Sequence, residues 1–215
     1  MKVNEPDARL ELMSGIERYY QFHAKIYDLT RWIYVFGRKE LVKRVSDYAA
    51  PKRILEVGCG TGKNLVTLSR VFPCAEITGI DMSSAMLAVA RKKTEGAGSR
   101  VILHQMSYDR PFSRSKPFDC ILFSYCLSMM NPGWMQAIKS ALSELKTNGF
   151  IAVVDFHESP LRILRAWGRL NYVRFGGHLL PYLAAVAKPT IAERRAAFFG
   201  LWEYFIFVGE NVFPR

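Results

Sequence analysis

Apolar and polar positions in the middle of the chain follow two periods in turn. Short apolar runs bounded by Gly, Pro or Asp are typical of buried strands, and apolar residues three and four apart are typical of helices. The runs that predict strands are 53–58, 75–81, 100–106, 118–130 and 150–156. The segments that predict helices between them are 62–72, 83–96 and 133–149. Strands alternating with helices of this length predict βαβ units and a parallel sheet.

The two flanks of this central region have different patterns. Residues 8–47 carry apolar positions at mixed spacings of three and four, which predicts helices broken at Gly15 and Gly37. Further on, the basic and aromatic stretch 161–187 also predicts helix, and 200–211 predicts a final, antiparallel strand. We find no internal repeat and no low-complexity linker.

Length and composition fit one domain. The chain has 215 residues, and 50% of them are hydrophobic, which is enough to fill a core. We expect a helical cap, a ligand-binding core and a last part of helices and final strands. Their predicted bounds are 1–50, 51–157 and 158–215.

Charge and cysteines narrow the class of protein. The net charge of +11 favours an anionic partner, although solubility alone would also account for it. The four cysteines lack the spacing of zinc ligands and have apolar neighbours. We therefore expect reduced, mostly buried thiols, no metal and a cytoplasmic protein. We also expect no secretory signal and no membrane span, because neither pattern occurs in the sequence.

A glycine-rich turn, LEVGCGTG at 55–62, follows the first predicted strand. A strand, a bare turn and a helix together bring backbone N–H groups close to a ligand. A phosphate loop would need glycine at Val57 and Ser or Thr at Asn64, so that interpretation fails twice. The dinucleotide pattern GxGxxG also fails, because the third glycine comes one residue early. The three glycines are Gly58, Gly60 and Gly62.

The turn resembles the first motif of class I S-adenosylmethionine-dependent methyltransferases. The resemblance implies a Rossmann-like α/β fold: a mostly parallel, seven-stranded sheet with helices on both faces and an N-terminal helical cap. It implies S-adenosylmethionine as cofactor, with Glu56 at the methionine amino group and the glycines under the methionine and ribose. Asp81, 19 residues past Gly62, matches the acid that binds both ribose hydroxyls, and Met82 would flank the adenine.

The third predicted strand departs from that family. An acidic residue usually follows it and binds the adenine amino group, but the segment here is HQMSYD. The aligned position is Met106, or Gln105 with a shift of one, and Ser107 offers a backbone N–H. The fourth strand normally ends beside the reacting methyl group, which implies Ser124 and Tyr125 there.

The flanks resemble the bacterial betaine-lipid N-methyltransferases over nearly the whole chain. The segments that carry this resemblance are HAKIYDLTRWIYVFGRKELV, SYCLSMM, VVDF and RAWGRLNYVRFGGHLLPYL. It implies threefold methylation of the amino group of diacylglyceryl-homoserine to a trimethylammonium betaine lipid. A phosphatidylethanolamine N-methyltransferase, a methyltransferase of a soluble small molecule or RNA, and a non-enzymatic binding protein with this fold remain alternatives.

Candidate substrate residues follow from the chemistry of that lipid. Tyr27 and Tyr125 offer aromatic faces that attract an ammonium group, and His23 is a candidate proton acceptor near neutral pH. Arg31 and Arg38 are candidates for the lipid carboxylate, because a guanidinium pairs with a carboxylate through two hydrogen bonds. Helix packing, a structural histidine and a solvated helix face are the competing interpretations.

The stretch 161–188 interleaves arginines with large apolar residues and contains no acid. This composition suits a helix in a membrane interface, although it would also suit RNA binding or a cap over the substrate pocket. We expect a lipid amine as substrate and peripheral contact with an anionic membrane surface at the inner face. Nucleic acid is not favoured as a partner, and the sequence gives no oligomeric state.

Overall fold

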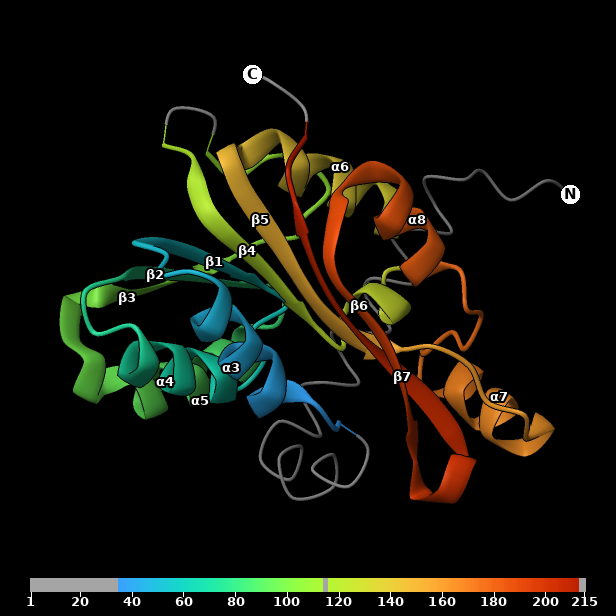
Figure 1. Cartoon of the computed structure of the whole chain (residues 1–215). Coiled ribbons are helices and arrows are strands. Elements are labelled where there is room, and N and C mark those ends of the chain that lie inside the picture. The colour runs from blue at the N-terminus through green and yellow to red at the C-terminus, as the bar shows by residue number, and fades with distance from the viewer. Residues whose placement is uncertain (1–34, 114–115, 213–215) are drawn as a thin grey trace, which may run out of the picture.

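A seven-stranded sheet runs through the middle of the molecule in the order β3-β2-β1-β4-β5-β7-β6 (Figure 1). The computed structural model describes residues 35–113 and 116–212. The strands are β1 (Arg53–Val57), β2 (Glu76–Asp81), β3 (Val101–Gln105), β4 (Phe118–Ser124), β5 (Leu145–Phe156), β6 (Lys188–Ala197) and β7 (Trp202–Glu210).

The first five strands are mutually parallel, β6 runs in the same direction, and among the described strands only β7 reverses. β1 pairs in parallel with both β2 and β4, whereas β7 is antiparallel to β5 and to β6. The carboxyl ends of the parallel strands therefore share one edge of the sheet. The strand order reverses between β1 and β4, and such a switch point is where open α/β sheets bind ligands.

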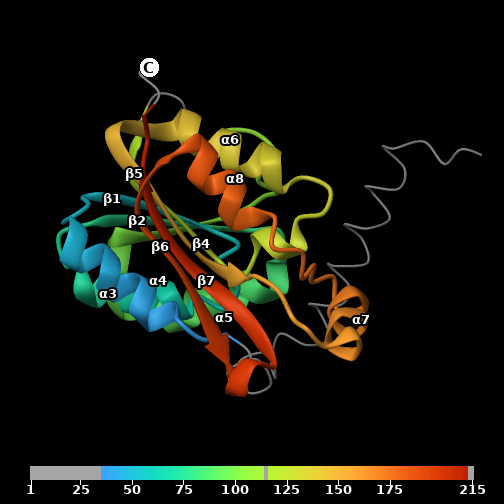
Figure 2. The ribbon, with the colours of Figure 1, turned by 45° about the vertical axis from the view of Figure 1, so that its right-hand side comes forward.

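Helices cover both faces of the sheet. The helices are α3 (Arg38–Tyr48), α4 (Lys63–Val71), α5 (Ser84–Thr94), α6 (Trp134–Glu144), α7 (Arg162–Leu170) and α8 (Leu179–Val186). Short 3₁₀ turns are η1 (Glu95–Arg100), η2 (Leu127–Met129) and η3 (Phe198–Gly200). Figures 1 and 2 show α3, α4 and α5 on one face, α6 and α8 on the other, and α7 beyond the sheet.

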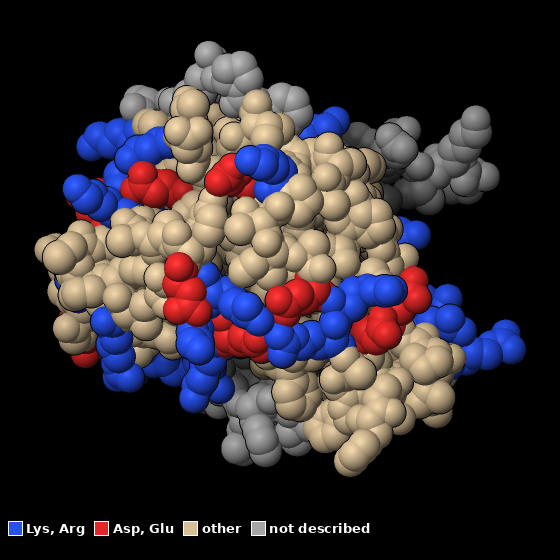
Figure 3. Space-filling view, viewed as in Figure 1, with Lys and Arg blue, Asp and Glu red and all other residues tan. Residues whose placement is uncertain are grey.

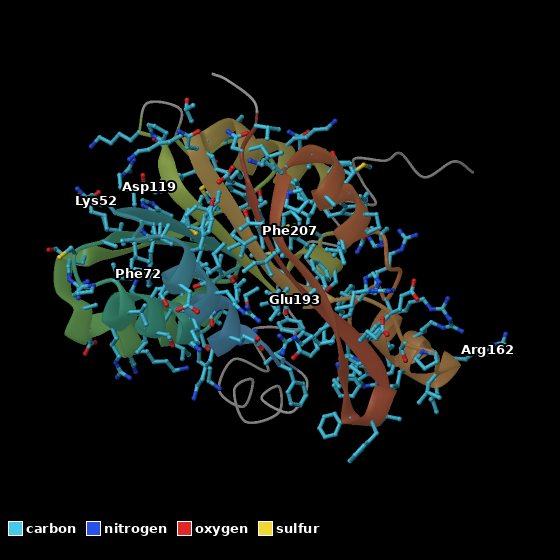
Figure 4. The ribbon with its side chains drawn as sticks, in the orientation of Figure 1. Lys52, Phe72, Asp119, Arg162, Glu193 and Phe207 are labelled. Carbon is cyan, nitrogen blue, oxygen red and sulfur yellow. The ribbon has the colours of Figure 1, made fainter. Side chains whose placement is uncertain are left out.

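Each face of the sheet has its own hydrophobic cluster. Phe72, at the end of α4, packs in the cluster under α3, α4 and α5. Phe207 of β7 packs with Leu183 of α8 and Ile138 of α6 on the opposite face (Figure 4). Central strands read as unbroken apolar runs because both of their faces are buried. Among the described helices, none combines the length and apolarity that crossing a bilayer requires.

The predicted fold class is confirmed, as are the five central strands. Gly37, with a φ of 76°, directly precedes α3, so the predicted break is found there. The rest of the predicted cap, residues 1–34, lies outside the described residues. The cysteines are free thiols, buried at all positions except the exposed Cys74.

Several elements differ from the prediction. The helix predicted over 133–149 ends at Glu144, because Leu145 pairs with Phe118 and Asn148 takes a left-handed φ of 65°. The single helical stretch 161–187 is two helices, separated where Tyr172 and Gly177 also have positive φ. Strand β6 was not located from its sequence, since KPTIAERRAA is an edge strand without a buried apolar face.

Asp119 clamps the amino ends of three strands together (Figure 4). Its Oδ2 accepts hydrogen bonds from the backbone N–H groups of Lys52 at 2.9 Å and Arg53 at 2.8 Å. Its Oδ1 accepts from Lys146 Nζ at 2.6 Å. Burial alone would raise the pKa of Asp119, but the hydrogen bonds from Lys146, Arg53 and Lys52 hold it below its usual value. The ionised carboxylate therefore stabilises the fold.

We expect Asp119→Ala to lower the free energy of unfolding by about 2 kcal/mol near neutral pH, because three donors lose their acceptor. The difference should shrink as the pH falls below about 4, where protonation removes the same interactions from the native protein. Urea titrations at several pH values measure this. Affinity for the cofactor that the sequence resemblance implies should not change, because Asp119 lies at the edge of the sheet opposite the carboxyl ends of the parallel strands; a loss of affinity would contradict this separation.

Candidate active site

One pocket opens where β1, β2 and β4 end. The turn after β1, the residues after β2 and β3, and the segment after β4 form its walls. The predicted site residues that line it are Arg38, Glu56, Gly58, Gly60, Asp81, Met82, Met106, Ser107, Ser124 and Tyr125. Gly62 does not line it. His23, Tyr27 and Arg31 lie outside the described residues.

Two glycines of the turn are required by close packing. Gly58 has a φ of 69°, and a Cβ there would lie 2.7 Å from Cys126 Cβ. Gly62 has a φ of 76°, and its Cβ would lie 3.0 Å from Ala90 Cβ on α5. Larger residues would thus push the turn away from the segment after β4 or separate α4 from α5. Gly62 therefore acts on the site indirectly, by allowing α4 and α5 to pack closely behind the turn.

Asp81 ties this turn to the end of β2. Its Oδ2 accepts from the Gly60 N–H at 2.8 Å, and its Oδ1 accepts from the Ser83 N–H at 2.9 Å. Burial raises the pKa of Asp81, and these backbone hydrogen bonds oppose the rise. A carboxylate oxygen accepts more than one hydrogen bond, so both oxygens retain capacity for the hydroxyls of a ribose.

Glu56 presents an unsatisfied carboxylate oxygen to the pocket. Its Oε1 accepts from Asn64 Nδ2 at 2.8 Å, whereas its buried Oε2 has no partner among the described residues. Burial raises the pKa of Glu56 to about 8, although Asn64 and the charge of Arg38 act against the rise. A buried acceptor of this kind is costly unless a ligand satisfies it. The ammonium group of a methionine moiety fits this position, so the residues present fit S-adenosylmethionine.

Arg38 brings a positive charge to the same pocket. Its guanidinium Cζ lies 5.6 Å from the centre of the Tyr125 ring. Its Nε is buried and has no hydrogen-bond partner in the described part of the chain. The guanidinium is therefore positioned to bind a carboxylate.

The end of β4 is buried and partly constrained. Ser124 Oγ is buried without a partner among residues 35–113 and 116–212. Tyr125 has a left-handed φ of 55°, and its hydroxyl donates to the Phe36 carbonyl oxygen at 2.7 Å. Burial raises the pKa of the Tyr125 hydroxyl well above its usual value. The ring faces the pocket, but the hydroxyl would have to leave Phe36 to exchange a proton, and its catalytic role stays a prediction.

The residues after β2 and β3 form the far end of the pocket. Met82, Met106 and Ser107 line it, whereas Gln105 does not and donates instead to the Met82 carbonyl oxygen at 3.3 Å. The Met106 N–H is used by the Asp81 carbonyl oxygen at 3.0 Å. Met106 therefore offers its side chain, and Ser107 remains the candidate for a backbone contact with adenine.

Sequence reasoning missed several residues of this pocket. Asn64 holds Glu56, and its only signal was its place after the glycine turn. Asp109 brings an acid to the far end three residues beyond the position where the family pattern expects one. Met129 and Met130 form a wall because β4 ends at Ser124 and the chain then turns through η2. The strand predicted over 118–130 is therefore six residues too long at its carboxyl end.

Comparison with known proteins finds methyltransferases. Residues 54–149 match the family model described as a methyltransferase domain. A demethylmenaquinone methyltransferase of Staphylococcus aureus is 28% identical over 178 residues, which cover 80% of this chain and 73% of that protein.

Two solved structures share the fold. The N-methyltransferase NodS of Bradyrhizobium japonicum, with S-adenosylhomocysteine, has a TM-score of 0.75 at 17% identity and covers 92% of this chain and 99% of its own. The 1,6-didemethyltoxoflavin-N1-methyltransferase of Burkholderia thailandensis has a TM-score of 0.72 at 13% identity, covering 98% and 92%.

The fold, the pocket and these matches define a class I methyltransferase. The chain is an S-adenosylmethionine-dependent methyltransferase, and the non-enzymatic alternative is set aside. No cluster of His, Cys, Asp or Glu suited to a metal ion occurs among the residues that the structure describes.

We expect S-adenosylhomocysteine to release about one proton on binding near neutral pH, because Glu56 is protonated in the free protein and must ionise beside an ammonium group. The release should vanish as the pH rises through about 8, the pKa of Glu56. Calorimetry in two buffers of different ionisation enthalpy measures it. Glu56→Gln should abolish the release and weaken binding, whereas the exposed Glu76→Gln should change neither. An unchanged release from Glu56→Gln would show that another group titrates.

Proposed function

We propose that this methyltransferase acts on the amino group of diacylglyceryl-homoserine and produces a trimethylammonium betaine lipid. The observation that carries the proposal is Arg38. Its half-buried side chain lies beside the Tyr125 ring in the cofactor pocket, with a buried Nε that no described residue satisfies. A homoserine headgroup carries the carboxylate that such a cation would bind, next to the amine that is methylated.

The chain's own residues would hold the reactants. When bound, S-adenosylmethionine supplies a methyl group already activated on a sulfonium. Glu56 would hold its ammonium group and Asp81 its ribose, while Met82 and Met106 flank the adenine. Met129 and neighbouring apolar groups would exclude water from the reacting centre. Fixing both reactants in line is the main contribution that the protein must make to methyl transfer.

An ammonium substrate must lose a proton before it can attack. We propose His23 as the acceptor, with Tyr27 orienting the amine, since the Tyr125 hydroxyl is engaged by Phe36. Arg31 is a second candidate for the headgroup carboxylate. Nitrogen as the methyl acceptor also agrees with the names of the two structural neighbours, both N-methyltransferases.

Methylation of a quinone ring carbon is the second candidate. The relative from Staphylococcus aureus is named for a demethylmenaquinone, and its 28% identity extends over 80% of this chain. The methionines that line the pocket suit an apolar ring as well as a lipid. Such an acceptor has no carboxylate, so Arg38 distinguishes the two functions.

A direct test measures transfer of a labelled methyl group to candidate acceptors in mixed micelles. We expect successive methylation of diacylglyceryl-homoserine, and no more than trace transfer to phosphatidylethanolamine, a demethylmenaquinone or RNA. Transfer to the quinone alone would replace the proposed function with the second candidate. If phosphatidylethanolamine were the better substrate, the acceptor would still be a lipid amine, but the proposal that Arg38 binds a substrate carboxylate would be wrong.

We expect Arg38→Met to raise the KM for diacylglyceryl-homoserine by about 10- to 100-fold, the loss expected for a charge-assisted hydrogen bond. The dissociation constant for S-adenosylhomocysteine should stay within about twofold, a shift too small to represent a lost hydrogen bond. Lys39→Met, an exposed neighbour on α3, is the matched control and should change neither value. A large loss of S-adenosylhomocysteine affinity in Arg38→Met would assign Arg38 to the cofactor's own carboxylate and contradict the substrate role.

A further inference from the structure

The turn between β6 and β7 exposes a cluster of large apolar side chains. Phe198 is 41% exposed, Phe199 is fully exposed and Leu201 is 43% exposed. No charged residue occurs from Ala196 to Trp202. Figure 1 shows this hairpin extending past the helices that cover the rest of the sheet. Apolar groups gathered at a protruding tip are typical of an interaction surface.

The backbone of this tip is also unusual. Phe198 and Phe199 have φ angles of 46° and 56°, in the left-handed region that non-glycine residues rarely occupy. Two successive aromatic residues in this conformation are held against their preference by the hairpin. Strain of this kind concentrates at functional segments.

Helix α7 presents two exposed rows of opposite character. Arg162, Arg165 and Arg169, spaced three and four apart, form a basic row, and all three are exposed. The next row, one residue further along, contains Ile163 and Leu170, which are 76% and 80% exposed. No acidic residue occurs between Glu158 and Glu193 in the sequence. The helix is therefore amphipathic, with its basic and apolar rows both facing outward.

Hydrogen bonds hold α7 and the hairpin tip side by side. Ser159 Oγ donates to the Leu201 carbonyl oxygen at 2.7 Å and accepts from the Leu161 N–H at 3.2 Å. The Glu203 N–H donates to the Glu158 carbonyl oxygen at 2.7 Å. Figure 2 shows both elements at the same end of the molecule. We call this surface the α7–hairpin end; it consists of Arg162, Ile163, Arg165, Arg169, Leu170, Phe198, Phe199 and Leu201.

The charges on the rest of this side differ from those of the α7–hairpin end. Figure 3 shows a band of alternating acidic and basic groups across the face. Within that region Arg195 pairs with Glu40 at 2.8 Å, and Arg44 pairs with Glu193 at 3.3 Å. Such paired charges leave little net attraction for an anion. Arg162 of α7, labelled in Figure 4, lies beyond this band.

We infer that the α7–hairpin end is an anchor for the surface of an anionic lipid bilayer. The arginines would lie at the lipid phosphates, while Phe199, Leu201 and Ile163 would enter the boundary between headgroups and acyl chains. Basic and apolar side chains on one surface are what interfacial binding requires, and anionic lipids attract each arginine. The inference rests on the proposed lipid substrate for its purpose, but not for its geometry.

A chain of contacts connects this end of the molecule with Tyr125 in the wall of the pocket. The Tyr125 ring packs 4.7 Å from Phe156, and Phe156 packs 5.0 Å from Phe175, which follows α7. The Tyr125 hydroxyl bonds the carbonyl oxygen of Phe36, whose ring lies 5.3 Å from Phe198 at the hairpin tip. A bilayer bound here would hold lipid headgroups close to the methyl-transfer site.

The test is flotation of the full chain with vesicles of phosphatidylcholine alone or mixed equally with phosphatidylglycerol. The hairpin variant is Phe199→Ser with Leu201→Ser, and the helix variant is Arg162→Gln, Arg165→Gln and Arg169→Gln. Their controls lie on α4, α5 and β3: Ile102→Ser with Val71→Ser, and Arg70→Gln, Arg91→Gln and Lys92→Gln. Ile102 and Val71 are 52% and 42% exposed, so this control also replaces two exposed apolar side chains by serine, although Phe199 alone is more exposed than either.

We expect wild-type protein to float only with the anionic vesicles. The hairpin variant should lose at least about tenfold in partition coefficient, and the helix variant about 100-fold. Both controls should stay within about twofold of wild type, as mutations outside the binding surface do. Equal binding by all the variants, or no flotation of the wild type, would overturn the inference. The inference would also be overturned if the helix variant lost binding to an RNA oligonucleotide but still bound the anionic vesicles like the wild type.

A short-chain, water-soluble analogue of the homoserine lipid separates this inference from the proposed function. Assayed without vesicles, both variants should methylate it at the wild-type rate, because neither changes the pocket. Vesicle binding without methylation of the analogue would leave the anchor standing and remove the proposed function. Methylation by a wild-type protein that does not float would remove the anchor alone.

Discussion

The carboxylate of Asp81 holds together the parts from which the site is built. One of its oxygens accepts the Gly60 N–H and the other accepts the Ser83 N–H, so the glycine turn and the beginning of α5 are fixed to the end of β2. The Gly58 and Cys59 N–H groups bond the carbonyl oxygen of Ile80 just before it. These bonds give the turn its path, and the path determines where this wall of the pocket lies. A residue suited to a ribose is thus also a structural tie.

Two groups in this pocket that lack a hydrogen-bond partner among the described residues indicate which ligand groups it binds. Glu56 keeps one buried oxygen without a described partner, and Arg38 keeps a buried Nε. The cost of leaving an acceptor and a donor unpaired is repaid when a ligand brings an ammonium and a carboxylate. S-adenosylmethionine carries the ammonium group that fits Glu56, and in the proposed function the homoserine headgroup carries the carboxylate that would bind Arg38. The pocket thus offers one complementary group to each of the two reactants that this proposal requires.

Tyr125 connects this chemistry with the outer surface. Its strained backbone turns the ring toward the pocket at the end of β4, and its hydroxyl fixes Phe36. Phe36 in turn packs against Phe198 of the hairpin tip. This end of the molecule is thus assembled from a strand end, the segment before a helix and a distant hairpin. Such surfaces have no sequence motif, because their members come from unrelated parts of the chain.

The sequence by itself determined the alternation of strands and helices, the glycine turn and the acids at the ends of the first two strands. These features are local: apolar runs, glycine spacing and a carboxylate at a strand end follow one another along the chain. Only the tertiary structure decided the edge strand β6, the Asp109 carboxylate in the pocket, and the pairing of α7 with the hairpin tip. Those depend on contacts between residues distant in sequence, where packing and hydrogen bonding override local preference.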